Sequence, residues 1–214
     1  MSGFGRLLSA LAMFALMPFG AQAQLLKVVE VNAPKVNCVF QTDCNIPVTD
    51  TVGNIALPFL AAQGTAWLQS RTFAGETGAP GVGTTGYEYR VSMTQASGSG
   101  CIIGLNINFG PHKQLPYLNN ALADVYVITT GGLGTIGLKT AERTGDVIQF
   151  TFKSALCADG PPNVAKTTFF FGLAAPAAPM HVNATAFAIG DPAFLGVDAR
   201  VPTHPVASDP PGGL

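Results

Sequence analysis

Residues 86–110, GYEYRVSMTQASGSGCIIGLNINFG, decide the fold class. Apolar and polar side chains alternate in both halves of this stretch, which is the pattern of a strand with one buried face. The apolar positions are Tyr87, Tyr89, Val91 and Met93 in the first half, and Cys101, Ile103, Leu105, Ile107 and Phe109 in the second. Residues 96–100, ASGSG, are typical of a turn. We therefore expect a hairpin whose apolar face includes Cys101.

The same pattern recurs along the chain. Further strands are expected at 27–31, 55–61, 65–73, 124–130, 135–140, 147–154, 166–175 and 181–189. The 25 glycines and 16 prolines separate these segments at short intervals, as in proteins built from strands and turns. The sequence predicts an all-β protein, folded as one antiparallel β-sandwich of about nine or ten strands.

The first 23 residues have the pattern of a cleaved signal peptide. Arg6 supplies a positive charge, residues 7–19 are apolar, and residues 21–23, AQA, match an A-x-A cleavage site. The apolar run is shorter than the roughly 20 residues that cross a bilayer. We expect secretion or periplasmic export from a bacterial-type cell, with no membrane span after cleavage. The mature chain is then one domain over residues 24–200, followed by a disordered Pro- and Gly-rich tail over residues 201–214.

Four cysteines predict the redox compartment. Cys38, Cys44, Cys101 and Cys157 form an even set, which in an exported protein indicates two disulfides. Spacing favours the short loop Cys38–Cys44, which leaves Cys101 to pair with Cys157. Structural zinc usually uses two short C-x₂₋₄-C pairs, and redox motifs use C-x-x-C; these spacings match neither. The cysteines therefore predict disulfides and no metal.

Charge limits the classes of partner. Charged residues are 11% of the chain, against roughly 25% in typical soluble domains. The sequence has neither the basic stripe of a nucleic-acid-binding protein nor the clustered Lys and Arg that bind an anionic membrane surface. Weakly charged surfaces suit proteins outside cells or in assemblies. We expect other surface or matrix proteins, or glycans, as partners, and no nucleic acid.

Candidate catalytic groups are few. The G-x-G-x-x-G match at residues 132–137 has no room for the helix of a dinucleotide site, so a glycine-rich turn is expected. There is no G-x-S-x-G motif. Glu88 and Asp124 could act as the acid pair of a glycoside hydrolase. Glu88 lies beside Arg90, however, and a cross-strand ion pair on a solvated sheet face accounts for it more simply. No catalytic residue is predicted.

Five residues are candidates for facing a ligand: Trp67, Tyr117, Asn119, Asn120 and Asp124. The two asparagines and Asp124 carry oxygen atoms of the kind that bind Ca²⁺. They lack the dense Asp-x-Asp pattern and the closing Glu of a calcium loop, and Asx residues also make turns. Trp67 and Tyr117 could stack on a sugar if they are exposed. No cofactor is predicted, with Ca²⁺ as the alternative.

The predicted function is a secreted, non-catalytic module with a binding or structural role at the cell surface, in the periplasm or in an extracellular matrix. The alternatives are a secreted hydrolase acting on polysaccharide, with Glu88 and Asp124 as its acids, and a carbohydrate-binding domain. Two carboxyl groups roughly 5–10 Å apart in a cleft would favour the hydrolase. An exposed, coplanar row of Trp67 and Tyr side chains would favour carbohydrate binding. Binding is expected at loops, including residues 74–85 and 109–122.

Overall fold

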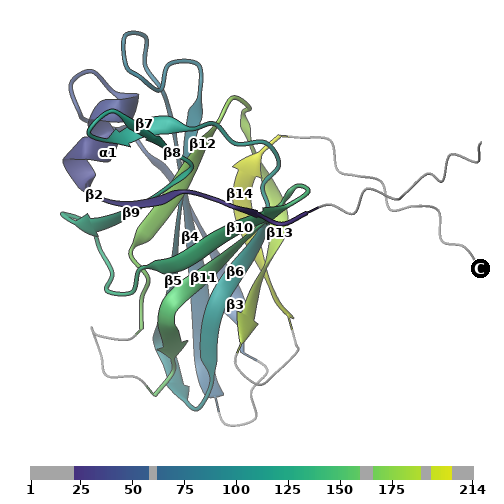
Figure 1. Ribbon diagram of the computed structural model, residues 1–214. Coiled ribbons are helices and arrows are strands. Elements are labelled where there is room, and N and C mark those ends of the chain that lie inside the picture. Colours follow the sequence, from purple (N-terminus) through teal and green to yellow (C-terminus); the bar gives the residue numbers. More distant parts are fainter. Residues whose placement is uncertain (1–21, 58–61, 160–165, 189–193, 204–214) are drawn as a thin grey trace, which may run out of the picture.

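Two packed sheets make up the protein (Figure 1). The computed structural model describes residues 22–57, 62–159, 166–188 and 194–203. These residues are mostly β, with one short helix, and the two sheets pack face to face. The predicted all-β sandwich is confirmed. The described residues contain fourteen strands rather than nine or ten, because several short edge and hairpin strands have no clear period-two pattern.

The first sheet has six strands in the order β1-β10-β11-β6-β13-β14. All neighbouring strands in it are antiparallel. Their bounds are β1 Gln24–Leu25, β10 Leu138–Thr144, β11 Val147–Cys157, β6 Cys101–Asn108, β13 Pro179–Ala188 and β14 Phe194–Pro202.

The second sheet also has six strands, in the order β2-β9-β12-β5-β4-β3. Its bounds are β2 Val28–Asn32, β9 Val125–Thr130, β12 Phe170–Ala175, β5 Thr85–Gly98, β4 Ala62–Ala74 and β3 Thr49–Ala56. Strand β2 pairs with β9 in parallel, and the other neighbours are antiparallel.

The hairpin expected at residues 86–110 is wrong, although both of its strands form. Strand β5 pairs with β4 and β12 in the second sheet, whereas β6 pairs with β11 and β13 in the first. The chain therefore crosses between the sheets at residues 99–100. The physical reason is that two strands with one apolar face each can bury those faces against one another from opposite layers, and periodicity alone does not distinguish this arrangement from pairing.

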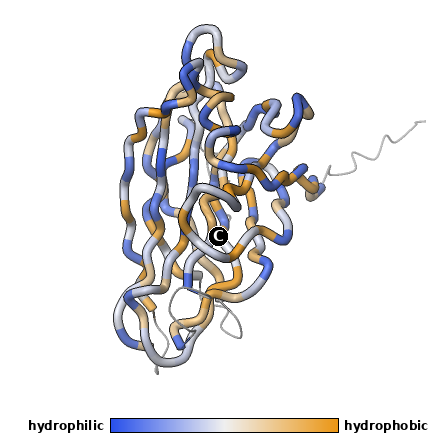
Figure 2. Tube along the Cα trace, turned by 90° about the vertical axis from the view of Figure 1, so that its left-hand side faces the viewer, coloured by the Kyte–Doolittle hydropathy of each residue, from blue (hydrophilic) through white to orange (hydrophobic). Residues whose placement is uncertain are grey.

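The core lies between the sheets, where the alternate apolar positions meet. Tyr87 and Tyr89 of β5 are fully buried, and their rings contact Phe109, directly after β6, and Phe150 of β11. Hydrophobic and hydrophilic positions alternate along the long strands in Figure 2. Each fully buried large apolar side chain contributes roughly 1.5–3 kcal/mol. The prediction that Tyr87 and Tyr89 serve core packing is confirmed.

The one helix among the described residues, α1 (Ala33–Phe40), lies on the outer face of the second sheet and was not predicted. The N-cap residue of the helix is Asn32, whose side-chain oxygen accepts a hydrogen bond from the Lys35 N–H at 2.9 Å. Pro34 occupies the first turn. The helix ends where the Gln41 N–H donates to the Asn37 carbonyl. Its buried residues are Val36, Val39 and Phe40.

A short hairpin lies beside this helix. Strands β7 (Leu115–Leu118) and β8 (Ala121–Ala123) are joined by Asn119 and Asn120, which both have positive φ, at 47° and 62°. Two consecutive left-handed residues are the geometry of a type I′ hairpin turn, in which asparagine is favoured. We call α1 and this hairpin together the cap. The cap buries a second apolar cluster against the sheet: Val31, Val36, Val39, Phe40, Phe73, Leu115, Tyr117, Ala123, Tyr126, Ile128, Phe170 and Ala174.

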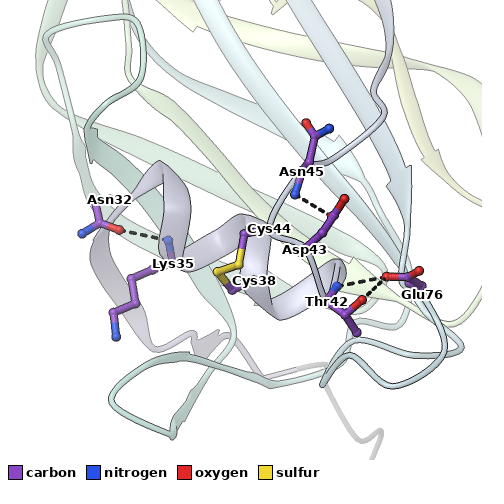
Figure 3. Close-up of a disulfide and its surroundings, with 8 residues drawn as sticks. All are labelled: Asn32, Lys35, Cys38, Thr42, Asp43, Cys44, Asn45 and Glu76. Carbon is purple, nitrogen blue, oxygen red and sulfur yellow. Dashed lines mark hydrogen bonds between the residues drawn. A yellow bond between two sulfur atoms is a disulfide. The ribbon is translucent and has the colours of Figure 1, made fainter.

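Both predicted disulfides are present. Cys38 of α1 pairs with Cys44 in the turn that follows the helix, and Cys101 pairs with Cys157, its direct register partner across β6 and β11. The turn around Cys44 is also fastened to the loop after β4, because the Thr42 N–H and hydroxyl donate to Glu76 at 3.0 and 2.8 Å (Figure 3). Two disulfides indicate an oxidising, extracellular or periplasmic environment.

The last strand extends into the predicted tail. Strand β14 continues to Pro202, so the first residues of the predicted tail belong to the first sheet. The predicted signal peptide up to residue 21 and the predicted tail from residue 204 lie outside the described residues. Within the described part of the chain, no helix has the length and apolar character needed to span a membrane.

Candidate functional site

A row of polar residues crosses the outer face of the second sheet. Asp50 of β3, Arg71 of β4, Glu88 of β5, Gly172 of β12 and Tyr126 of β9 are successive register partners. They point outwards because their chain neighbours point into the core, and side chains alternate along a strand. We call these five residues the polar row.

Two sets of hydrogen bonds and one ion pair link the four side chains of the polar row. Arg71 donates to both carboxylate oxygens of Asp50, at 2.9 and 3.1 Å, and its Nη1 lies 3.8 Å from Glu88 Oε2. The Tyr126 hydroxyl donates to Glu88 Oε1 at 3.2 Å. The guanidinium of Arg71 lies over the Phe170 ring, 4.5 Å from its centroid. The bidentate bond and the stacking hold this guanidinium in one orientation.

Glu88 is buried, and the predicted solvated face is wrong at this position. Its exposed fraction is 3%. Arg71, Tyr126 and the neighbouring ring of Phe170 surround it, and the cap covers the adjoining part of the face. Burial raises the pKa of Glu88 to about 7, against the opposing effects of the Arg71 charge and the Tyr126 hydrogen bond. The cross-strand ion pair itself is present, and Arg71 is the partner.

A pocket of about 380 Å³ opens between the cap and the sheet, with Arg71 and Glu88 among its lining residues. Its other lining residues are mainly apolar: Ala33, Asn37, Ile46, Val48, Phe73, Ile128, Gly131, Gly132, Leu133 and Phe170. The two glycines belong to or adjoin the G-x-G-x-x-G match, which forms a loop before β10 and not the start of a helix. A β-carbon on Gly132 would lie 2.8 Å from Ile128 Cγ2, so glycine leaves room there.

A second, shallower pocket of about 480 Å³ lies on the same outer face, over β3, β4 and β5. We call its lining residues the open face: Val52, Asn54, Trp67, Gln69, Arg90, Thr94 and Gln95. Gln69 and Arg90 are register partners in the row next to the polar row. Arg90 lies over two rings, 4.9 Å from the centroid of Trp67 and 5.2 Å from that of Phe170. Burial and the nearby Arg71 lower the pKa of Arg90.

Asp124 is held in a separate hydrogen-bond cluster under the β7–β8 hairpin. It accepts the Lys27 N–H at 2.7 Å, and its other oxygen lies 2.8 Å from both His112 Nε2 and Gln114 Nε2. Burial raises the pKa of Asp124, but the three hydrogen bonds outweigh it and the net pKa is lowered. Asp124 does not line the pocket that Glu88 lines. The structure therefore does not bring the two predicted acids of the hydrolase alternative into one pocket.

The other predicted ligand-facing residues are placed differently from one another. Trp67 is half-buried on the open face. Tyr117 is 1% exposed, with its ring against Tyr126. Asn119 and Asn120 form the hairpin turn, although they and Tyr117 also line a pocket beside α1. All four tyrosines are buried, so they form no exposed row with Trp67.

The described residues lend no support to the calcium hypothesis. Among them, no three His, Cys, Asp or Glu side chains are grouped closely enough to hold a metal ion. N–H groups already occupy both carboxylate oxygens of Asp124, and a cation would have to displace them. The hypothesis stays a prediction without a site.

Sequence reasoning missed Arg71, Tyr126 and His112 as members of these clusters. The period-two alternation in the sequence is enough to place Glu88 and Arg90 on one face of β5. Their partners come from β4 and β9, and only the pairing of distant strands brings them together. His112 and Asp124 are twelve positions apart and meet because the β7–β8 hairpin folds back between them.

Comparison with known proteins identifies no relative of this chain. No protein-family model matches the chain, and searches of curated proteins and of solved structures give no significant match. The function is therefore argued from the geometry of the molecule.

Proposed function

We propose that the protein is an exported, non-catalytic binding module whose ligand lies on the outer face of the second sheet. The observation that carries the proposal is the position of Arg71 and Arg90. Both guanidiniums stack on Phe170, and they line two pockets in neighbouring rows of the face beside the cap. The chain has few charged residues, so two oriented cations beside two pockets are the strongest candidates for groups that bind a ligand. The disulfides support a role outside the cytoplasm.

The hydrolase alternative has one observation in its favour. Glu88 lines a pocket and has a pKa of about 7, which is the property of a general acid at neutral pH. A glycoside hydrolase needs a second carboxyl group across an open space. The nearest acid along the polar row is Asp50, and Arg71 lies between the two and bonds to Asp50. This arrangement favours binding over acid–base catalysis.

Nuclear magnetic resonance tests both functions in one experiment. The ¹⁵N-labelled protein is titrated with a soluble polysaccharide extract of the producing cells' envelope, and the chain length of the extract is measured afterwards. We expect shifts at amides of the open face and the Glu88 pocket, with unchanged chain length. Shifts confined to other surfaces, or none, would contradict the proposal. Shortened chains would favour the hydrolase, provided that Glu88→Gln stops the shortening and the matched Glu142→Gln on β10 does not.

A further inference from the structure

Arg90 has no polar partner within the described part of the chain. The three other arginines there are all engaged: Arg71 by Asp50, Arg143 by the Gly145 carbonyl, and Arg200 by the Thr72 hydroxyl. Arg90 makes only the two ring contacts, and its Nε is buried without a hydrogen bond. Arg90 is half-buried, and a buried Nε without a hydrogen bond is costly, so this side chain is a candidate for bonding to a ligand through the groups it still exposes.

The surroundings of Arg90 define which ligand group it can take. The open face contains no acid, and the two nearby acids of the polar row, Asp50 and Glu88, face Arg71. Because Nε is closed off, a ligand can reach the guanidinium only through its two Nη nitrogens. Two parallel N–H groups on one edge of a planar cation match the two oxygens of a carboxylate. The Arg90 guanidinium stacks on the rings of Trp67 and Phe170, and these contacts fix the plane of the guanidinium before a ligand binds.

The other groups of the open face indicate what carries this carboxylate. Asn54 and Gln95 each offer both an amide donor and a carbonyl acceptor. Gln69 donates through its amide nitrogen to Asp50 at 2.9 Å, which leaves its carbonyl oxygen and one N–H for a ligand, and the Thr94 hydroxyl shares a hydrogen bond with Ser92 at 3.0 Å. Groups that donate and accept suit sugar hydroxyls, which do the same. An acidic peptide of glutamate or aspartate would supply carboxylates to Arg90, the single cation among the open-face residues, but no hydroxyl groups for the side-chain amides. The arrangement therefore favours a saccharide with one carboxylate per unit.

We infer that the open face binds an acidic saccharide of the uronic acid class, whose carboxylate pairs with the Nη groups of Arg90 and whose hydroxyls bond to the side-chain amides. The inference rests on the proposed binding function and narrows it to one ligand class. The partly exposed Trp67 ring supplies an apolar surface beside the cation, against which the face of a sugar ring can pack.

Calorimetric titration with a matched pair of probes tests this inference. The probes are oligogalacturonate of six units and the same oligomer with its carboxylates methyl-esterified. The wild-type protein is expected to bind the acid about tenfold more tightly than the ester, with an affinity that falls as salt rises. This comparison needs no substitution and so does not depend on the folding of a variant.

Substitutions then assign the effect to Arg90. Arg90→Gln is expected to remove the preference for the acid, and Arg90→Lys to weaken binding about tenfold, because an ammonium keeps the charge but loses the planar pair of donors. Arg143→Gln on the first sheet is the matched control and should leave the affinity unchanged.

Several results would overturn the inference. They are equal affinity for acid and ester, unchanged acid binding in both Arg90 variants, no binding of the acid, or tighter binding of a glutamate hexapeptide with the same dependence on Arg90. None of these results decides the proposed binding function, which is tested separately with the envelope extract. Failure of the acidic-saccharide inference can therefore be distinguished from failure of the proposed function.

Discussion

A β-carbon on Gly172 would lie 2.7 Å from the hydroxyl oxygen of Tyr126. Gly172 stands between Glu88 and Tyr126 in the polar row, as register partner of both. The missing side chain therefore provides the space through which the tyrosine hydroxyl reaches the carboxylate two strands away. The Glu88 site depends on glycine at this position.

The first prediction concerns Gly172→Ala. The added carbon would also lie 2.3 Å from the Tyr87 carbonyl oxygen, and backbone cannot move without disturbing the sheet. We expect a loss of about 2–3 kcal/mol in the free energy of unfolding, measured by urea denaturation. Gly137→Ala is the control, because the nearest atom to its β-carbon is a Lys153 side-chain carbon at 3.4 Å. Equal stability of the two variants would contradict the role assigned to Gly172.

The second prediction concerns the pH dependence of stability. The pKa of Glu88 rises from an ordinary 4.5 to about 7 on folding, so the native state holds this proton more tightly than the unfolded state. The resulting stabilisation is present below pH 4.5 and is lost as pH rises through 7, amounting to about 3 kcal/mol. Glu88→Gln removes this dependence and keeps an acceptor for the Tyr126 hydroxyl.

Urea denaturation between pH 5 and 8 measures the effect. The stability of the wild type relative to Glu88→Gln should fall as pH rises, because histidine titration is common to both proteins and cancels. Glu142→Gln on the exposed side of β10 should follow the wild type. Parallel profiles for wild type and Glu88→Gln would show that Glu88 has an ordinary pKa.

The third prediction concerns Asp124→Ala. The variant leaves the Lys27 N–H, Gln114 and His112 without their acceptor, and we expect a loss of about 3 kcal/mol at pH 7 by thermal or urea unfolding. Because the pKa of Asp124 is lowered on folding, its contribution is present above pH 3.8 and falls away as pH drops through the native pKa. Asp198→Ala, which removes an exposed partner of His181, should change stability little. Similar losses in both variants would contradict the buried cluster.

The fourth prediction ranks the two disulfides. Replacing Cys101 and Cys157 by serine opens the longer loop, with a sequence separation of 56, and replacing Cys38 and Cys44 opens one of 6. The chain-entropy relation gives losses of about 4 and about 2 kcal/mol respectively. Unfolding of the two double variants in urea tests the order, and the reverse order would contradict it. A thiol titration of the denatured wild type should detect no free thiol.

Most of the fold was predictable because alternation is local. The long strands and the inward positions of β5 follow from period two, and the cysteine count leads to the disulfides. The assignment of strands to sheets was not predictable, since β5 and β6 show the same pattern whether they pair or face one another. Strand β14 was not predicted although Leu195, Val197, Ala199 and Val201 alternate in it, because its last residues merge with a proline-rich sequence that is typical of a tail.

The cap and the candidate site show a different limit. Helix α1 has a readable start, with Asn32 as N-cap and Pro34 in the first turn, but its eight residues are too few to show a clear helical period. The polar row joins four side chains and one glycine from five strands, and its order follows only from register. Glu88 has no local signal of burial, because the residues that cover it are distant in sequence.

The first described strands have a consequence for the integrity of the whole sandwich. Gln24–Leu25 borders the first sheet beside β10, and Val28–Asn32 borders the second beside β9, so one short segment closes both sheets on the same side (the purple ribbon of Figure 1). Loss of that segment would leave the backbone N–H and C=O groups at the edges of β10 and β9 without hydrogen-bond partners. Removal of residues 24–32 is therefore expected to promote aggregation, because the two exposed sheet edges can pair with strands of other chains.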